Sequence, residues 1–149
     1  MNKKDRAKEL FGSGYNCAQS VIGAFCDELG IDFDTAMKIS EGFGGGMGRM
    51  RLTCGAVSAM TMAVGLLLSR GSGEGDTRAE VYETVHSLAD EFAKKNGSII
   101  CGDLLGLNEK PSYNPTPEAR TDEYYKKRPC MELVGDCAEL IELYIESLR

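Results

Sequence analysis

The sequence predicts an all-α protein, a compact multi-helix bundle around one central apolar helix at about residues 54–69. Apolar residues recur mostly at helical spacing, and the chain nowhere sustains the apolar–polar alternation typical of a half-buried strand. Capping residues and glycine stops separate the apolar stretches, as expected at helix ends. Because 149 residues are the length of one domain, we expect a single helical domain over residues 1–149.

The first third of the chain predicts three helices followed by a loop. The helices are expected at residues 3–11, from an Asn16 N-cap to Gly30, and at about residues 34–43. Five of the seven residues in 42–48 are glycine. Since each glycine costs a helix roughly 1 kcal/mol, this stretch is expected to be a loop.

The rest of the chain predicts four more helices. Thr53 is expected to cap the central helix at residues 54–69, which is apolar almost all round. The others are expected from Asp76 or Thr77 to residue 95, at residues 98–105, and at residues 130–148 with Pro129 in the first turn. Three prolines in residues 111–117 predict a surface loop.

Composition and charge argue against several function classes. With 17 basic and 23 acidic residues the net charge is −6, which repels phosphates, so we expect neither nucleic acid nor a membrane as partner. The basic N-terminus runs straight into an amphipathic segment and does not resemble a secretory signal. The most apolar stretch, residues 54–68, is shorter than the roughly 20 residues that span a bilayer. We therefore expect a cytoplasmic protein.

Six cysteines give the strongest indication of chemistry. In the reducing cytoplasm such cysteines are more often buried, catalytic or metal-binding than bridged. Four fall at or near expected helix starts: Cys17, Cys54, Cys101 and Cys130. The partial positive charge of a helix N-terminus stabilises a thiolate, so we expect their pKa values to be lowered. Cys26 and Cys137 lie on apolar helix faces, which predicts a packing role.

The spacing of the cysteines excludes several metal and haem sites. No C-x-x-C pair and no zinc-finger, ribbon or ferredoxin pattern occurs, so the fold itself must assemble any joint site. His86 is the single histidine, which excludes both a haem attachment motif and a multi-histidine metal site. Its place within an expected helix predicts a surface or half-buried side chain.

The glycine-rich loop is the second candidate for function. Without side chains, Gly44, Gly45 and Gly46 let the backbone approach a ligand, and their N–H groups could form an anion nest beside Arg49 and Arg51. The loop matches neither the Walker phosphate-binding pattern nor the dinucleotide-binding fingerprint. An equally weighted alternative is a tight crossover packed against the central helix.

Five motifs along the chain resemble, in order, those of the C_GCAxxG_C_C family. They are Asn16-Cys17-Ala18-Gln19, the loop at residues 42–49, residues 54–59, Cys101 with Leu104-Leu105-Gly106, and Arg128-Pro129-Cys130. The family comprises proteins of about this length that are described as redox-active. Its four characteristic cysteines match Cys17, Cys54, Cys101 and Cys130, which implies a redox role for them. The family's central motif ends in glycine, where this chain has Ala59.

Three functions are compatible with these residues. The leading hypothesis is a thiol oxidoreductase in which Cys54 and one or more of Cys17, Cys101 and Cys130 meet at converging helix starts. Two of these cysteines cycle between dithiol and disulfide, passing two electrons to a partner protein. The alternative is a metal-binding module whose four cysteines hold an iron-sulfur cluster or a zinc ion. The third is a non-catalytic helical interaction protein with packing cysteines. If the central helix is partly bare, we expect a homodimer to complete its burial.

Overall fold

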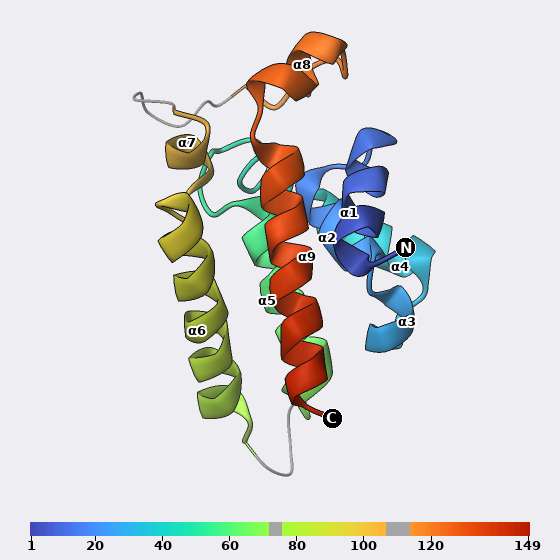
Figure 1. Cartoon of the computed structure of the whole chain (residues 1–149), viewed down its shortest axis with the longest axis vertical. Coiled ribbons are helices and arrows are strands. Elements are labelled where there is room, and N and C mark those ends of the chain that lie inside the picture. The colour runs from blue at the N-terminus through green and yellow to red at the C-terminus, as the bar shows by residue number, and fades with distance from the viewer. Residues whose placement is uncertain (72–75, 107–113) are drawn as a thin grey trace.

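Helices form nearly all the regular structure in the described residues, so the all-α prediction is confirmed. The computed structural model describes residues 1–71, 76–106 and 114–149. Across these ranges it has nine helices (Figure 1): α1 (Lys3–Gly12), α2 (Cys17–Gly23), α3 (Cys26–Leu29), α4 (Phe33–Glu41), α5 (Gly55–Leu68), α6 (Arg78–Asn96), α7 (Cys101–Leu104), α8 (Asp122–Lys127) and α9 (Cys130–Ser147). The β-type pairing found in the same residues is one isolated antiparallel bridge, between Thr53 and Ile100.

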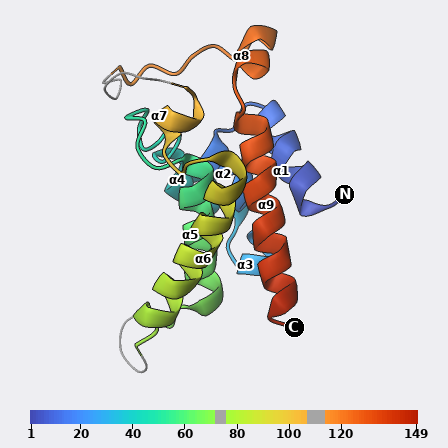
Figure 2. The same cartoon turned by 60° about the vertical axis from the view of Figure 1, so that its left-hand side comes forward.

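The longest helices run side by side, and the short N-terminal helices pack against them. Helices α5, α6 and α9 follow the long axis of the molecule in both views (Figures 1 and 2). Helix α9 contacts α1, α2, α5 and α6, while α2 lies between α1, α4 and α5. Helices α7 and α8 lie at the end of the molecule where α9 begins (Figure 2). This end carries the candidate site.

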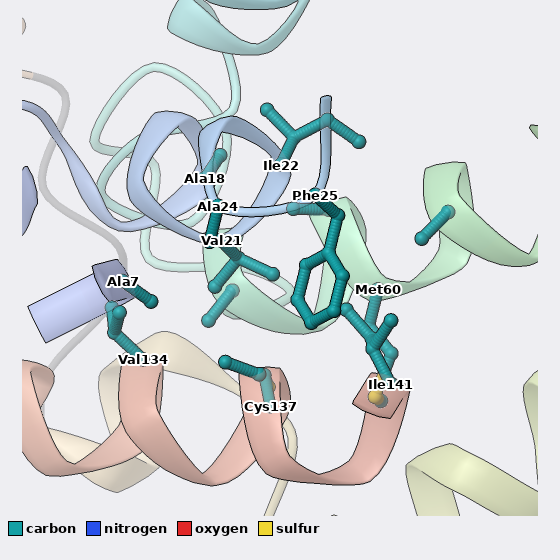
Figure 3. Close-up of a cluster of buried hydrophobic side chains, with 14 of the residues drawn as sticks. Ala7, Ala18, Val21, Ile22, Ala24, Phe25, Met60, Val134, Cys137 and Ile141 are labelled. Carbon is teal, nitrogen blue, oxygen red and sulfur yellow. The ribbon is translucent and has the colours of Figure 1, made fainter. Parts of the chain in front are cut away.

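Small residues let the helices approach closely in the core. Ala18 of α2, Ala59 of α5 and Ala138 of α9 have no exposed area. In the same core the ring of Phe25 points toward Met60 and Ile141 (Figure 3), and all three side chains are almost fully buried. Burying a large apolar side chain stabilises a fold by about 1.5–3 kcal/mol, so this cluster holds α2, α5 and α9 together.

The helix expected from Asn16 to Gly30 is divided into two. After α2, the N–H groups of Ala24 and Phe25 donate to Val21 and Ile22, three residues back, instead of four. This tighter turn directs the Phe25 ring into the core, where it is 1% exposed. The stop at Gly30 is confirmed, because Gly30 caps α3 in the left-handed conformation.

The central helix is covered as far as Val64 and partly bare beyond it. In α5 the buried positions run from Gly55 to Val64, packed by α2, α6 and α9, whereas Leu66 is 48% exposed. The predicted homodimer that would cover this end therefore stays a prediction. In the described residues, the model has no helix combining the length and apolar character needed to cross a bilayer.

Other helix boundaries differ from the predicted ones, mainly where residues 51–54 pair with residues 99–102. Thr53 pairs with Ile100 instead of capping α5, and Cys54 takes the N-cap position. The helix expected at 98–105 is shortened to α7 because residues 99–102 are hydrogen-bonded to residues 51–54. Helix α8 was not predicted. In the expected loop at 111–117, residues 114–117 have no regular structure, and residues 111–113 lie outside the described residues.

A pair of substitutions on α6 tests this core. Phe92 is 1% exposed and Tyr82 is 62% exposed. We expect Phe92→Ala to lower the free energy of unfolding by about 3–5 kcal/mol, because it leaves a cavity. Tyr82→Ala is expected to change it by less than about 0.5 kcal/mol. Urea unfolding followed by circular dichroism measures both, and equal effects would contradict the packing described here.

Candidate functional site

The four cysteines at helix starts line one cavity of about 60 Å³. Cys17, Cys101 and Cys130 are the first residues of α2, α7 and α9, and Cys54 is the N-cap of α5. The prediction that they lie at helix starts is confirmed, and the fold brings all four together. Cys54 and Cys101 are buried, while Cys17 and Cys130 are half-buried.

A capping box positions Cys17. The Asn16 side chain accepts a hydrogen bond from the Gln19 N–H at 2.9 Å, and the Gln19 side chain accepts one from the Asn16 N–H at 3.0 Å. The Asn16 amide also donates to the carbonyl of Glu41 at 2.8 Å. These bonds fix the start of α2 against the end of α4, as the predicted Asn16 N-cap requires.

Backbone pairing between residues 51–54 and 99–102 positions Cys54 and Cys101. The Cys54 N–H donates to Ile99 at 2.8 Å, and the Cys101 N–H donates to Leu52 at 2.6 Å. The Gly102 N–H reaches the carbonyl of Arg51 at 3.1 Å. Two cysteines that are far apart in the sequence are thereby held at neighbouring positions.

The glycine-rich loop closes the cavity from the side of α4. Five consecutive residues, 45–49, have positive φ, and so does Arg51. Met47, Arg49 and Arg51 adopt this conformation with φ of 67°, 63° and 62°, although it costs a residue with a side chain roughly 1–2 kcal/mol. Such local strain is concentrated at functional sites in proteins.

The loop glycines permit close approach to the cysteines. A Cβ atom at Gly46 would lie 2.6 Å from the Cβ of Cys101 and 2.7 Å from the Leu52 nitrogen. A Cβ atom at Gly55, in the first turn of α5, would lie 2.5 Å from the sulfur of Cys17. The missing side chains therefore let loop and helix pack directly against two of the four thiols.

The predicted anion nest and the observed loop agree only in part. The N–H group of Gly44 donates to the carbonyl of Glu41 at 3.3 Å, and the N–H groups of residues 47–52 donate to carbonyls of residues 42–47, so these groups are not free to bind an anion. Gly44, Gly45 and Arg49 nevertheless line a larger cleft of about 430 Å³ beside the cysteine cavity. Gly46 lies against Cys101 instead. Ligand binding by Gly44, Gly45, Gly46 and Arg49 stays a prediction.

Burial raises the pKa values of three of the four thiols. It raises the pKa of Cys54 to about 12 and that of Cys130 to about 12, and it raises the pKa of Cys17. The backbone N–H groups of Ala56 and Val57 lower the pKa of Cys54, but by less than burial raises it. The expectation that helix starts lower these pKa values is therefore wrong for Cys17, Cys54 and Cys130, because desolvation disfavours the thiolate.

The thiols also influence one another electrostatically. Negative charge on Cys101 raises the pKa values of Cys17, Cys54 and Cys130. Charge on Cys17 has a larger effect than charge on Cys101 at both Cys54 and Cys130. Ionisation of one thiol in the cavity therefore disfavours ionisation of its neighbours.

Arg51 is the cationic group that contacts a thiol of the cavity. Its Nη1 lies 3.7 Å from the sulfur of Cys101, and the residue is only 8% exposed. None of the ion pairs found in the described residues involves Arg51, and its buried Nε has no hydrogen-bond partner there. This contact with a cationic donor distinguishes Cys101 from the other three thiols.

The remaining candidates lie outside the cavity. Cys137 is completely buried in the core, as its predicted packing role requires, and the half-buried Cys26 donates its thiol to the Ile22 carbonyl at 3.7 Å. His86 is exposed on α6. Sequence reasoning missed Arg120 and Tyr124, which line the cavity, because single charged or aromatic residues before a helix are usually ordinary surface residues.

The donor atoms are not arranged as a metal site. Among the residues that the structure describes, no three cysteine, histidine, aspartate or glutamate side chains are grouped so that they could hold a metal ion. Four thiols are chemically suited to zinc or an iron-sulfur cluster, but coordination would require the cavity to contract around the metal.

Comparison with known proteins now decides the family. The family model described as "Putative redox-active protein (C_GCAxxG_C_C)" matches residues 15–144. The chain belongs to the C_GCAxxG_C_C family. A relative from Archaeoglobus fulgidus, named only "Uncharacterized protein", is 29% identical over 154 residues, covering 98% of this chain and 93% of the relative. No solved structure matches the chain. The predicted membership of the C_GCAxxG_C_C family is confirmed.

Two glycine substitutions separate close packing from backbone strain. Gly46 and Gly48 both have positive φ, but a Cβ atom at Gly48 would come no closer than 3.9 Å to any neighbour. We expect Gly48→Ala to cost about 1–2 kcal/mol from backbone strain alone. Gly46→Ala should cost at least about 2 kcal/mol more, since overpacking adds to the strain. Urea unfolding measures both, and equal losses would show that Gly46 does not pack against Cys101.

The raised pKa of Cys54 predicts a loss of stability at alkaline pH. Its pKa is about 12 in the fold against an ordinary value of 9.0, so the folded state holds a proton that the unfolded state releases. Stability from this thiol is therefore complete below pH 9 and lost between pH 9 and about 12, by up to about 1.4 kcal/mol per pH unit. Urea unfolding at several pH values should give a shallower slope for Cys54→Ser. An unchanged slope would contradict the raised pKa.

Proposed function

We propose that this protein is a thiol oxidoreductase whose four-cysteine cavity exchanges electrons by dithiol–disulfide chemistry. The observation that carries the proposal is that Cys17, Cys54, Cys101 and Cys130, from four separate helix starts, line one cavity. Packing alone does not require thiols at these four positions, whereas a two-electron thiol reaction requires two of them in contact. Membership of a family described as redox-active is consistent with this chemistry.

In this proposal Cys101 is the attacking thiolate. Arg51 donates to its sulfur, and a thiolate is the nucleophile in disulfide exchange. The raised pKa values of Cys54 and Cys130 keep those thiols protonated near neutral pH. One reactive sulfur is thus surrounded by thiols that do not compete for the same partner disulfide.

In this proposal Cys17 is the second cysteine, the one that forms a disulfide with Cys101. It lines the same cavity as Cys101, and its charge affects both Cys54 and Cys130 more strongly than that of Cys101 does. The Cys101 thiolate attacks one sulfur of a partner disulfide, the partner's S–S bond breaks, and the departing thiolate takes up a proton. Cys17 then loses its proton and attacks the Cys101 sulfur, which releases the second partner thiol. Two protein thiols are oxidised and one disulfide is reduced to two thiols.

The reducing cytoplasm is the compartment that we propose for this cycle. Reduced glutathione and thioredoxin keep cysteines as thiols there. The reduced protein is then the resting form, and a partner disulfide is its oxidant.

Thiol counting by mass spectrometry tests this function. Reduced protein, exposed to a low-molecular-weight disulfide without oxygen, is expected to lose two free thiols and regain both with dithiothreitol. Cys101→Ser should abolish the loss, because it removes the proposed nucleophile. Cys137→Ser, a matched control in the core, should retain it.

Peptide mapping of the oxidised protein identifies the bridged pair. A disulfide between Cys17 and Cys101 is expected, and a bridge that excludes Cys101 would overturn the proposed roles. If no pair of cysteines oxidises reversibly, the thiol-redox function is wrong. Near-stoichiometric iron or zinc that survives dialysis and disappears in Cys54→Ser would also overturn it, in favour of the metal-binding alternative.

A further inference from the structure

The cysteine cavity adjoins a second, larger hollow on the same face of the molecule. This cleft has a volume of about 430 Å³, within the range of about 300–1,000 Å³ typical of sites for small molecules. The two hollows share six lining residues, Asn16, Gly45, Arg51, Arg120, Tyr124 and Arg128. The two hollows therefore meet along these six residues.

The described walls of the cleft are positively charged in an acidic protein. Four arginines and two glutamates line it: Arg49, Arg51, Arg120, Arg128, Glu41 and Glu118. Four positive and two negative charges leave an excess of two positive charges, whereas the whole chain carries −6. A cleft lined mainly by one sign of charge attracts ligands of the opposite sign.

The acidic residues do not neutralise these arginines individually. Arg49 and Arg128 share one carboxylate, that of Glu118. Arg120 donates to two backbone carbonyls, those of Phe11 and Tyr15, at 3.2 and 3.0 Å. Its guanidinium also lies 4.6 Å from the centre of the Phe11 ring, so it is held in place at the cleft wall without a carboxylate partner among the described residues.

Arg51 connects the charge of the cleft with the thiols. It is only 8% exposed, and it lines both hollows. Its Nη1 lies 3.7 Å from the sulfur of Cys101. A positive charge shared by the cleft wall and the thiol cavity attracts an anion toward that sulfur.

We propose that the arginine-lined cleft binds a small dianionic disulfide, which is the oxidant of the cysteine cavity. The proposal rests on the function proposed above and names its substrate class. Two carboxylates of such a molecule match the two excess positive charges. The cleft is too small for a protein domain, and the thiols are at least half-buried, so a small molecule reaches them more readily than the partner protein expected from the sequence.

The exchange needs no further reactant. The disulfide bond of the bound dianion breaks as the sulfur of Cys101 bonds to one of its sulfurs, and the other half leaves as a thiolate that is protonated. The thiol of Cys17 then loses its proton and displaces the remaining half. The products are one protein disulfide and two small anionic thiols.

Three disulfides that differ in charge test the proposal on the unmodified protein. They are 3,3′-dithiodipropionate (−2), bis(2-hydroxyethyl) disulfide (neutral) and cystamine (+2). For each disulfide we measure the rate at which the protein loses free thiols. This rate is divided by the rate at which the same disulfide reacts with a simple free thiol. The dianion is expected to react at least about tenfold faster than the neutral disulfide, and this preference should fall with added salt.

Variants locate the effect in the cleft. Arg128→Gln should lower the preference for the dianion at least threefold, since it removes one cleft charge. Arg51→Met should also lower the preference for the dianion. Arg51→Lys keeps the charge and should therefore retain part of this preference. Arg78→Gln is the matched control: it changes the net charge equally, but Arg78 is exposed at the start of α6 and does not line the cleft.

Suberate, which has the length of dithiodipropionate but no disulfide, separates binding from redox chemistry. Calorimetry with the reduced protein is expected to detect its binding and a weaker affinity in Arg128→Gln. If all three disulfides oxidise the protein at equal relative rates and suberate does not bind, the substrate proposal is wrong while the thiol function stands. If suberate binds but no disulfide oxidises a cysteine pair, the cleft is an anion site and the redox function fails.

Discussion

The pairing of residues 51–54 with residues 99–102 is the constraint on which the candidate site depends. Its hydrogen bonds, 2.8 Å from Cys54 to Ile99 and 2.6 Å from Cys101 to Leu52, bring two cysteines together from distant parts of the chain. The same short stretch places Arg51 against the sulfur of Cys101. The loop that leads into it must turn sharply after α4, which explains why its glycines and three strained residues lie here.

The end of the molecule that carries the cysteine cavity costs more free energy to form than the ordinary helix packing in the rest of the bundle. Elsewhere, small residues such as Ala18 and Ala59 give ordinary close helix packing. Around the cavity the chain combines positive φ at Met47 and Arg49, thiols whose pKa values are raised by burial, and a buried guanidinium nitrogen without a partner. Natural sequences violate such local rules mainly at functional sites, where the cost is offset by packing elsewhere.

The sequence predicts the helical fold class, the Asn16 cap of α2 and the position of four cysteines at helix starts, because capping residues and apolar spacing are local signals. It predicts neither α8 nor the start of α7. It cannot predict that Cys17, Cys54, Cys101 and Cys130 share a cavity, since only the tertiary fold joins positions so widely spaced. The same limit explains the wrong pKa direction: a helix N-terminus can be recognised in a sequence, whereas the desolvation that outweighs it depends on burial. The break before Phe25 is also a tertiary effect, as the apolar pattern continues through it.

The electrostatics of the cavity oppose the accumulation of negative charge on its thiols. Each thiolate raises the pKa values of its neighbours, so a second ionisation in the same small space is unfavourable. The dithiol–disulfide exchange proposed above needs only one thiolate at a time, because each step has one attacking sulfur. Four thiolates held together would instead need a cation among them, and in the described residues Arg51 is the cationic group that contacts a thiol. One arginine can compensate one thiolate, which matches a site that ionises a single cysteine at a time and stores electrons as a thiol pair.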